Sequence, residues 1–241
     1  NLDDVKRIMA AEREPMKLMF GFNHRFHPGV LEARAIVEGQ RLGKIVALRG
    51  VYGKSGGLGF ERSWRNDRGI SGGGILLDQG IHMVDLFCHL CGDFQEVKCF
   101  AGNSFWNFNI EDNAFLILRN EAGQTAGLHS SATLWKHTFR LDIILENGYL
   151  VVEGLLSKSG SYGRECLVVG KRQFEDEARA VGNPSEEIMY FDRDESWKLE
   201  VDAFVESIRG GSAVSSGSSA DALRVMRIIE AGYLDAGMER G

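Results

Sequence analysis

Two ionisable side chains, Asp78 and His82, stand four residues apart just after the glycine run at residues 72–74. On an α-helix this spacing places both side chains on one face, about one turn apart. A carboxylate in that position orients the imidazole and raises its proton affinity. Because histidine changes protonation near neutral pH, the pair is suited to proton transfer. The alternative interpretation is a structural ion pair on a surface helix.

The same ionisable face continues at helical spacing through Asp85 and His89. Apolar side chains occupy the other sides of this segment, namely Leu76, Met83, Val84, Phe87 and Leu90. This division predicts a helix that packs its apolar sides in the core and ends at Cys91-Gly92. One face of one helix is therefore the candidate site of chemistry.

A CxxC spacing, Cys88 to Cys91 with His89 between them, is a pattern that zinc and redox sites use. The sequence contains four cysteines and no second CxxC that would complete a set of four ligands. We therefore expect no metal site. The preferred interpretation is that these cysteines are small apolar side chains inside the helix.

The composition limits the class of protein. With 241 residues and 44% hydrophobic content, the chain is long enough for one large or two small globular domains. A net charge of -6, with scattered lysines and arginines, argues against nucleic-acid binding. No apolar run approaches the ~20 residues of a membrane span, and the acidic start is unlike a signal peptide. The expected compartment is the cytoplasm.

The pattern along the chain predicts an α+β fold. A helix over residues 2–12, capped by Asn1, and a buried strand at 17–22 are typical of the end of a βαβ unit. A helix at 28–38 and a strand at 44–53 follow. After the Asp78/His82 helix, strands are predicted at 96–102, 112–119, 125–133, 139–145 and 149–153, which form an antiparallel meander. Residues 155–184 are poorly marked, 187–191 suggest another strand, and helices at 196–209 and 220–236 end the chain.

Several short motifs occur in one order along the chain. They are Asn23-x-Arg25-Phe26, Trp64-Arg65, and Gly72-Gly73-Gly74 followed by Asp78, His82 and Asp85. In this order and spacing the chain resembles the family of glucose-fructose oxidoreductase and myo-inositol dehydrogenase. That family joins a Rossmann domain, which binds NAD or NADP, to a C-terminal α+β domain. The second domain has an open, mainly antiparallel sheet with helices and substrate residues on one face.

The resemblance implies a division of the chain. Residues 1–23 would be the tail of an otherwise absent Rossmann domain, and residues 24–241 the substrate-binding and oligomerisation domain. The family often associates through the exposed face of the sheet, so a homodimer or homotetramer is expected. One face of the predicted meander lacks covering helices, which favours the same arrangement.

The resemblance also implies roles for single residues. His82 would be the acid/base acting on a hydroxyl or carbonyl of a sugar, cyclitol or related polyol, and Asp78 would orient it. Asn23 and Arg25 would lie at the domain junction near the nicotinamide. For Arg25, a structural salt bridge at the end of a strand is the alternative.

A loop rich in glycine, residues 53–74, carries further candidates for substrate binding. Trp64 offers an apolar face for a sugar ring, and Lys54, Arg65 and Arg68 offer donors to hydroxyl, carboxylate or phosphate groups. Ordinary surface packing is the alternative for all four residues.

The chain also departs from the family pattern. It has no GxGxxG, and the family's Glu-Lys-Pro motif, whose lysine is catalytic, would fall just before Asn1. We expect a fragment of a longer enzyme rather than a natural short form, and weak binding of NADH or NADPH by the chain alone. The alternative function is a stand-alone carbohydrate-binding or scaffold domain without redox activity.

Overall fold

A computed structural model describes residues 1–176 and 179–238 of the chain. Within these residues, one sheet has the strand order β2-β3-β4-β1-β5-β6-β7-β8. The strands are β1 (Ile45–Gly53), β2 (Glu96–Gly102), β3 (Asn113–Arg119), β4 (Thr125–Ser131), β5 (Thr138–Leu145), β6 (Gly148–Glu153), β7 (Glu165–Lys171) and β8 (Glu186–Phe191). β1 runs parallel to β4, and the other neighbouring pairs are antiparallel. The fold is therefore α+β with an open, mainly antiparallel sheet.

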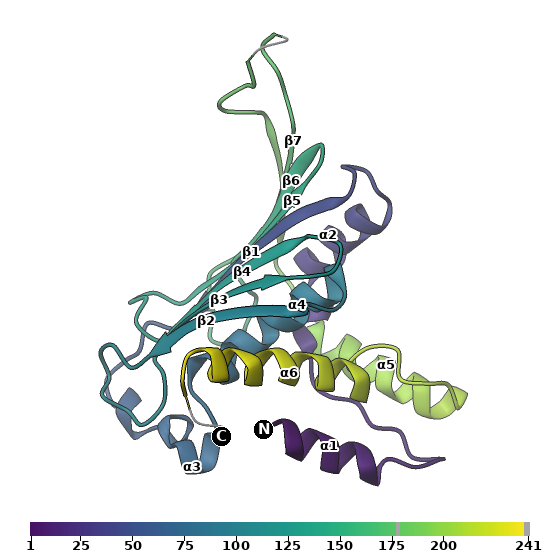
Figure 1. The fold of residues 1–241 in the computed structure, drawn as a ribbon. Coiled ribbons are helices and arrows are strands. Elements are labelled where there is room, and N and C mark those ends of the chain that lie inside the picture. Colours follow the sequence, from purple (N-terminus) through teal and green to yellow (C-terminus); the bar gives the residue numbers. More distant parts are fainter. Residues whose placement is uncertain (177–178, 239–241) are drawn as a thin grey trace.

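Helices cover one face of this sheet. The longer ones are α1 (Leu2–Ala11), α2 (Pro28–Glu38), α4 (Ile81–Cys91), α5 (Ser196–Gly210) and α6 (Ser219–Asp235). Figure 1 shows α2, α4 and α6 on the same side of the strands, with α1 beside α6. Short helical turns η1 (Asn23–Phe26), η2 (Phe60–Arg62), η3 (Trp64–Asn66), α3 (Arg68–Ser71) and η4 (Leu76–Gly80) connect them.

The two faces of the sheet differ in exposure because side chains alternate along each strand. Leu116 and Leu118 of β3 are fully buried beneath the helices, together with Leu141 and Ile143 of β5. On the opposite face, Phe100 is 83% exposed. Cross-strand pairing continues this face from Phe100 through Phe115 to His129. The open face therefore carries apolar side chains that no described helix covers.

Most predicted elements are confirmed within one or two residues. The strand predicted at residues 17–22 is wrong, because this segment runs extended beside the loop before α6, with Phe20 donating its N–H to the carbonyl of Gly217 (2.7 Å). No strand among the described residues pairs with it to form a ladder, which a strand requires.

The simple meander is also wrong in one place. β1 lies between β4 and β5 and pairs with both, so these two consecutive strands are not neighbours. Local turn signals cannot reveal such an insertion, because it depends on a strand far away in sequence. In the poorly marked segment 155–184, the structure places β7 and an isolated bridge between Phe174 and Ala180, while residues 177–178 lie outside the described part.

Candidate functional site

A buried carboxylate, Glu111, binds the backbone at the end of the glycine run. Its two oxygens accept the N–H groups of Gly74 (2.9 Å) and Leu76 (3.0 Å) and the hydroxyl of Tyr233 (2.8 Å). A Cβ at Gly74 would lie 2.1 Å from the carbonyl oxygen of Glu111, so a side chain cannot fit there. The glycines thus allow close packing, and Glu111 satisfies the first N–H groups of the segment that carries Asp78.

Asp78 lies in η4, a π-helical turn that leads into α4. A π-helix hydrogen-bonds to the fifth residue rather than the fourth, so it changes the angular relation that an α-helix would give Asp78 and His82. The Asp78 carboxylate instead accepts hydrogen bonds from Lys54 Nζ and from Arg65 Nε (3.2 Å). Among the described residues no side-chain hydrogen bond joins Asp78 to His82, so the predicted orienting contact is wrong.

His82, at the start of α4, also differs from the prediction in its electrostatics. Burial lowers the pKa of His82 to about 4, although the nearby Asp78 charge acts in the opposite direction. Its Nδ1 is buried and has no hydrogen-bond partner within the described residues. The expected rise in proton affinity is wrong because loss of solvation outweighs the attraction of a carboxylate that already faces two cations.

Buried aromatic and polar side chains that the sequence analysis missed surround His82. The imidazole of His24 stacks on His82, and its Nε2 lies 3.0 Å from the Tyr52 hydroxyl. His27 Nδ1 lies 2.8 Å from the buried carboxylate of Glu165. The run Asn23-His24-Arg25-Phe26-His27 holds two histidines beside the recognised motif, which is the sequence signal for them. Glu165 lies in the poorly marked segment and gives no such signal.

Two of the predicted loop residues converge on Asp78, and two remain at the rim. Lys54 and Arg65 line a narrow cavity with Asp78. The ring of Trp64 packs under the guanidinium of Arg65, with 4.5 Å from Cζ to the ring centroid. Arg68 begins α3, where its N–H donates to Asn109 Oδ1 (3.3 Å). The polar centre of the candidate site is therefore the group Lys54, Arg65 and Asp78 beside His82.

A larger cavity of about 320 Å³ adjoins this centre and shares Lys54 with it. Phe60 and His137 contribute rings to its wall, and glycines of the loop at 56–59 provide backbone. The His137 Nδ1 lies 3.2 Å from the Ser55 hydroxyl. Apolar rings beside a few polar donors are typical of small-molecule sites.

Asn23 and Arg25 are both buried and bonded within the chain. Arg25 is 4% exposed, and its guanidinium donates to both oxygens of Asp85 (2.8 and 2.6 Å) and to Asp221 (3.2 Å). Asn23 Nδ2 donates to the Ser196 hydroxyl (3.3 Å). The geometry favours the structural salt bridge that the sequence left open for Arg25.

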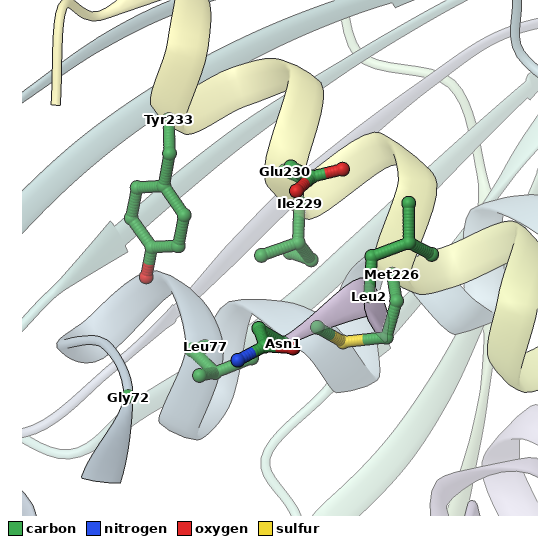
Figure 2. Close-up of a pocket in the computed structure, with 8 residues that line it drawn as sticks. All are labelled: Asn1, Leu2, Gly72, Leu77, Met226, Ile229, Glu230 and Tyr233. Carbon is green, nitrogen blue, oxygen red and sulfur yellow. The ribbon is translucent and has the colours of Figure 1, made fainter. Parts of the chain in front are cut away.

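Another cavity, of about 20 Å³, lies between α6, Gly72 and the first two residues of the chain. Figure 2 shows Met226, Ile229 and Tyr233 of α6 around it, together with Leu77. The Tyr233 hydroxyl is already bonded to Glu111. At about 20 Å³ this space holds little more than one water molecule, so it is a packing void rather than the candidate site.

The two cysteines of the CxxC spacing, Cys88 and Cys91, both lie in α4. Cys88 is buried in α4, and burial raises the pKa of the Cys91 thiol to about 12. Within residues 1–176 and 179–238, no group of three or more His, Cys, Asp and Glu side chains is arranged to bind a metal ion. Over the same residues, no helix has the length and apolar character needed to cross a membrane.

Comparison with known proteins agrees with this arrangement. Residues 30–151 match the GFO/IDH/MocA C-terminal domain. The chain belongs to this family. Levoglucosan dehydrogenase of Pseudarthrobacter phenanthrenivorans is 35% identical over 82 residues, which cover 33% of this chain and 21% of that enzyme. The aligned part is thus about a fifth of the length of this relative.

Solved structures share the fold over nearly the whole chain. A levoglucosan dehydrogenase in complex with NADH and levoglucosan superposes with a TM-score of 0.83 at 20% identity, covering 98% of this chain and 69% of that one. The aldose-aldose oxidoreductase of Caulobacter crescentus, complexed with glycerol, gives a TM-score of 0.80 at 23% identity and covers 98% and 67%. These superpositions establish that the chain has the α+β fold of this family.

Proposed function

We propose that this chain is the substrate-binding domain of an NAD(P)-dependent oxidoreductase that acts in the cytoplasm on a sugar, cyclitol or related polyol. The observation that carries the proposal is a neutral, largely buried His82 near Asp78, whose carboxylate binds Lys54 and Arg65. Lys54 also lines the cavity of about 320 Å³. Relatives with this fold include dehydrogenases in complex with NADH and a sugar. Residues 24–241 form the substrate domain in this proposal, and residues 1–23 are the tail of the dinucleotide-binding domain.

In this proposal His82 accepts the proton of a substrate hydroxyl. The nicotinamide, when bound, supplies the acceptor for the hydride that leaves the carbinol carbon. His82 is neutral at pH 7 because its pKa lies at about 4, so the imidazole can take up a proton. Its buried Nδ1 is inaccessible, and the proton must therefore arrive at Nε2. The negative charge of Asp78 offsets the charge that develops on the ring.

The cationic side chains around Asp78 position the substrate. Lys54 Nζ and Arg65 Nε donate to Asp78 and can exchange part of this bonding for substrate hydroxyl or carboxylate oxygens. Trp64 and Arg68 contribute to the rim. A sugar presents several hydroxyls to such a group at once, and this fixes which carbon faces His82.

The residues described here do not form a cradle for the phosphates of NAD or NADP. Arg25 and Asn23 are bonded to Asp85 and Ser196, so we propose that they hold the backbone at the domain junction near the nicotinamide rather than bind phosphate. The phosphates then bind to the dinucleotide-binding domain of the whole protein.

The proposal is tested with the full-length protein in a screen of sugars, cyclitols and sugar acids, followed by nicotinamide absorbance. We expect turnover of at least one of these substrates with NAD or NADP. Saturable sugar binding by calorimetry with no turnover in either direction would instead support the stand-alone binding domain. No binding and no turnover would contradict both functions.

We also propose that the chain forms a homodimer or homotetramer through the open face of the sheet. Phe100, Phe115 and Ile117 are exposed side by side there, and a soluble monomer seldom leaves such a surface uncovered. Light scattering coupled to size exclusion checks this. A monomer mass at all micromolar concentrations would contradict it, whereas Phe115→Lys should dissociate a sheet-face dimer.

A further inference from the structure

The ring of His82 lacks the hydrogen bond that usually fixes a catalytic imidazole. Its Nδ1 is buried without a partner in the described part of the chain, and Asp78 is bonded to Lys54 and Arg65 instead. An imidazole without such a bond can rotate about its side-chain torsions unless packing prevents it. Some other contact must therefore set the plane of the ring.

The stacked ring of His24 provides this contact. The two imidazole centroids are 4.1 Å apart, and the ring planes differ by 19°. His24 is buried, and Tyr52 and Phe139 pack against its other sides with centroid distances of 5.3 and 5.9 Å. A ring held on this side leaves His82 little freedom to tilt, because tilting would open a gap in a closely packed interior.

His24 is itself fixed at both ring nitrogens. Its Nδ1 lies 3.1 Å from Asn23 Oδ1, and its Nε2 lies 3.0 Å from the Tyr52 hydroxyl. Because an amide oxygen only accepts, Nδ1 carries the hydrogen and donates it, and Nε2 accepts the hydroxyl hydrogen of Tyr52. Asn23 is anchored in turn through its Nδ2 to Ser196. Both ring nitrogens of His24 are therefore engaged within the chain, and protonation of Nε2 would require the Tyr52 hydroxyl to turn its hydrogen away.

We propose that His24 is a positioning residue that holds the His82 ring by stacking, directs His82 Nε2 to the substrate and confines the transferred proton to His82. This proposal rests on the proposed function of His82 as proton acceptor. The ionisable groups that face His82 are Asp78 from η4, His24 from η1, and His27, which follows η1 and is bonded to Glu165 of β7. Of these, His24 alone is in face-to-face contact with the ring among the described residues.

The electrostatics of the pair agree with this role. Burial lowers the pKa of His24 well below its usual value, so that both stacked rings are neutral at pH 7. A second proton on the pair would place two cations face to face with little water between them. Only one ring of the stack can therefore be charged during turnover. The hydrogen bonds of His24 favour its neutral form, so the proton resides on His82.

The first test uses the chain itself, with labelled histidine, in an NMR titration of His82. We expect a pKa of about 4 in the wild type and, in His24→Ala, a rise toward the ordinary value of about 6.5, because water enters the vacated space. His24→Phe keeps a stacked ring without the hydrogen bonds and should leave the pKa of His82 low. His129→Ala is the matched control, because His129 stacks on Phe115 at 4.0 Å on the open face, away from His82.

The second test measures kinetics of the full-length enzyme. We expect His24→Ala to lower kcat about 10- to 100-fold with KM changed little, since His82 loses its fixed orientation. The acidic limb of the pH profile should shift upward, because water in the vacated space raises the pKa of His82. His24→Phe should retain activity within about fivefold, because the stack remains.

The outcomes separate the two proposals. An unchanged His82 titration in folded His24→Ala would overturn the positioning role, and so would a His24→Phe variant in which His82 titrates at its ordinary pKa. The phenylalanine variant decides the question if His24→Ala does not fold. A wild-type full-length protein without nicotinamide-dependent turnover would count against the proposed function alone, because the NMR titration does not depend on activity.

Discussion

The pairs Asp78/His82 and Asp85/His89 have the same spacing on successive turns of one helical segment, yet their surroundings are opposite. The Asp78 side chain is 27% exposed and faces Lys54 and Arg65, whereas the Asp85 side chain is fully buried against Arg25. The Nδ1 of His82 is buried and has no hydrogen-bond partner in the described structure. The Nε2 of His89 lies 2.5 Å from Nη1 of Arg34.

The difference shows how a candidate catalytic pair is recognised. A partly exposed carboxylate and an imidazole whose Nδ1 lacks a hydrogen bond identify it, whereas the spacing of the two residues alone does not. A guanidinium can only donate, so the lone pair of His89 is occupied by Arg34. Burial, Arg25 and Arg34 together lower the pKa of His89 to about 3. The second pair thus joins α4 to α2 through the hydrogen bond from Arg34 to His89, and α4 to α6 through the ion pairs of Arg25 with Asp85 and Asp221. The first pair is left for a ligand.

The largest expected effect is on turnover. His82→Ala in the full-length enzyme should lower kcat about 10²- to 10⁴-fold and leave cofactor affinity nearly unchanged, since a general base acts mainly in the transition state. His89→Ala is the matched control and should stay within a few-fold of wild type. Steady-state kinetics with a cofactor titration distinguish the two. Equal losses in both variants would mean that the pairs do not differ in function.

The second effect is on stability and should fall on the other pair. Asp85→Asn leaves the buried Arg25 charge with Asp221 as its remaining carboxylate, and we expect a loss of about 3 kcal/mol in the free energy of unfolding. Asp78→Asn removes a partly solvated ion pair and should cost no more than about 1 kcal/mol. Urea unfolding of the chain measures both. If Asp78→Asn proved the more destabilising, the contrast drawn between the pairs would be mistaken.

Much of the fold could be predicted because its signals are local. The helix Pro28–Glu38 has proline in its first turn, and the strand Glu96–Gly102 alternates between its faces, so both appear with the predicted bounds. The insertion of β1 between β4 and β5 could not be predicted, because it depends on pairing between segments about 80 residues apart, such as Ala47 with Thr125. The error at residues 17–22 arose because an apolar run does not show whether a partner strand exists.

The candidate site was predicted in its residue types more than in its contacts. Spacing brought Asp78 and His82 to attention, but the π-helical turn and the cations from the loop, which decide what Asp78 binds, leave no mark in a local pattern. The sign of the pKa change at His82 depends on burial, and burial follows from tertiary packing of residues such as His24. Charge pairs can be guessed from sequence, whereas loss of solvation cannot.

The smallest effect is on pH dependence, and here both pairs should act in the same direction. A histidine whose pKa is lowered by folding, as for His82 to about 4, binds its proton more weakly in the folded state than in the unfolded chain, where the pKa is about 6.5. Stability is therefore fully present above about pH 6.5 and is lost as the pH falls toward 4, by at most about 1.4 kcal/mol per pH unit for this residue. Urea unfolding of the chain at pH 7, 6 and 5 should show this decline in the free energy of unfolding.

His82→Gln should make the decline shallower over this pH range. His89→Gln should act in the same direction, because the pKa of His89 is also lowered. The carboxylates contribute equally to the wild type and to both variants, so their contribution cancels when the slopes of unfolding free energy against pH are compared. A slope unchanged in His82→Gln would mean that the ring is solvated in the folded chain, and the description of His82 as a buried neutral base would then fail.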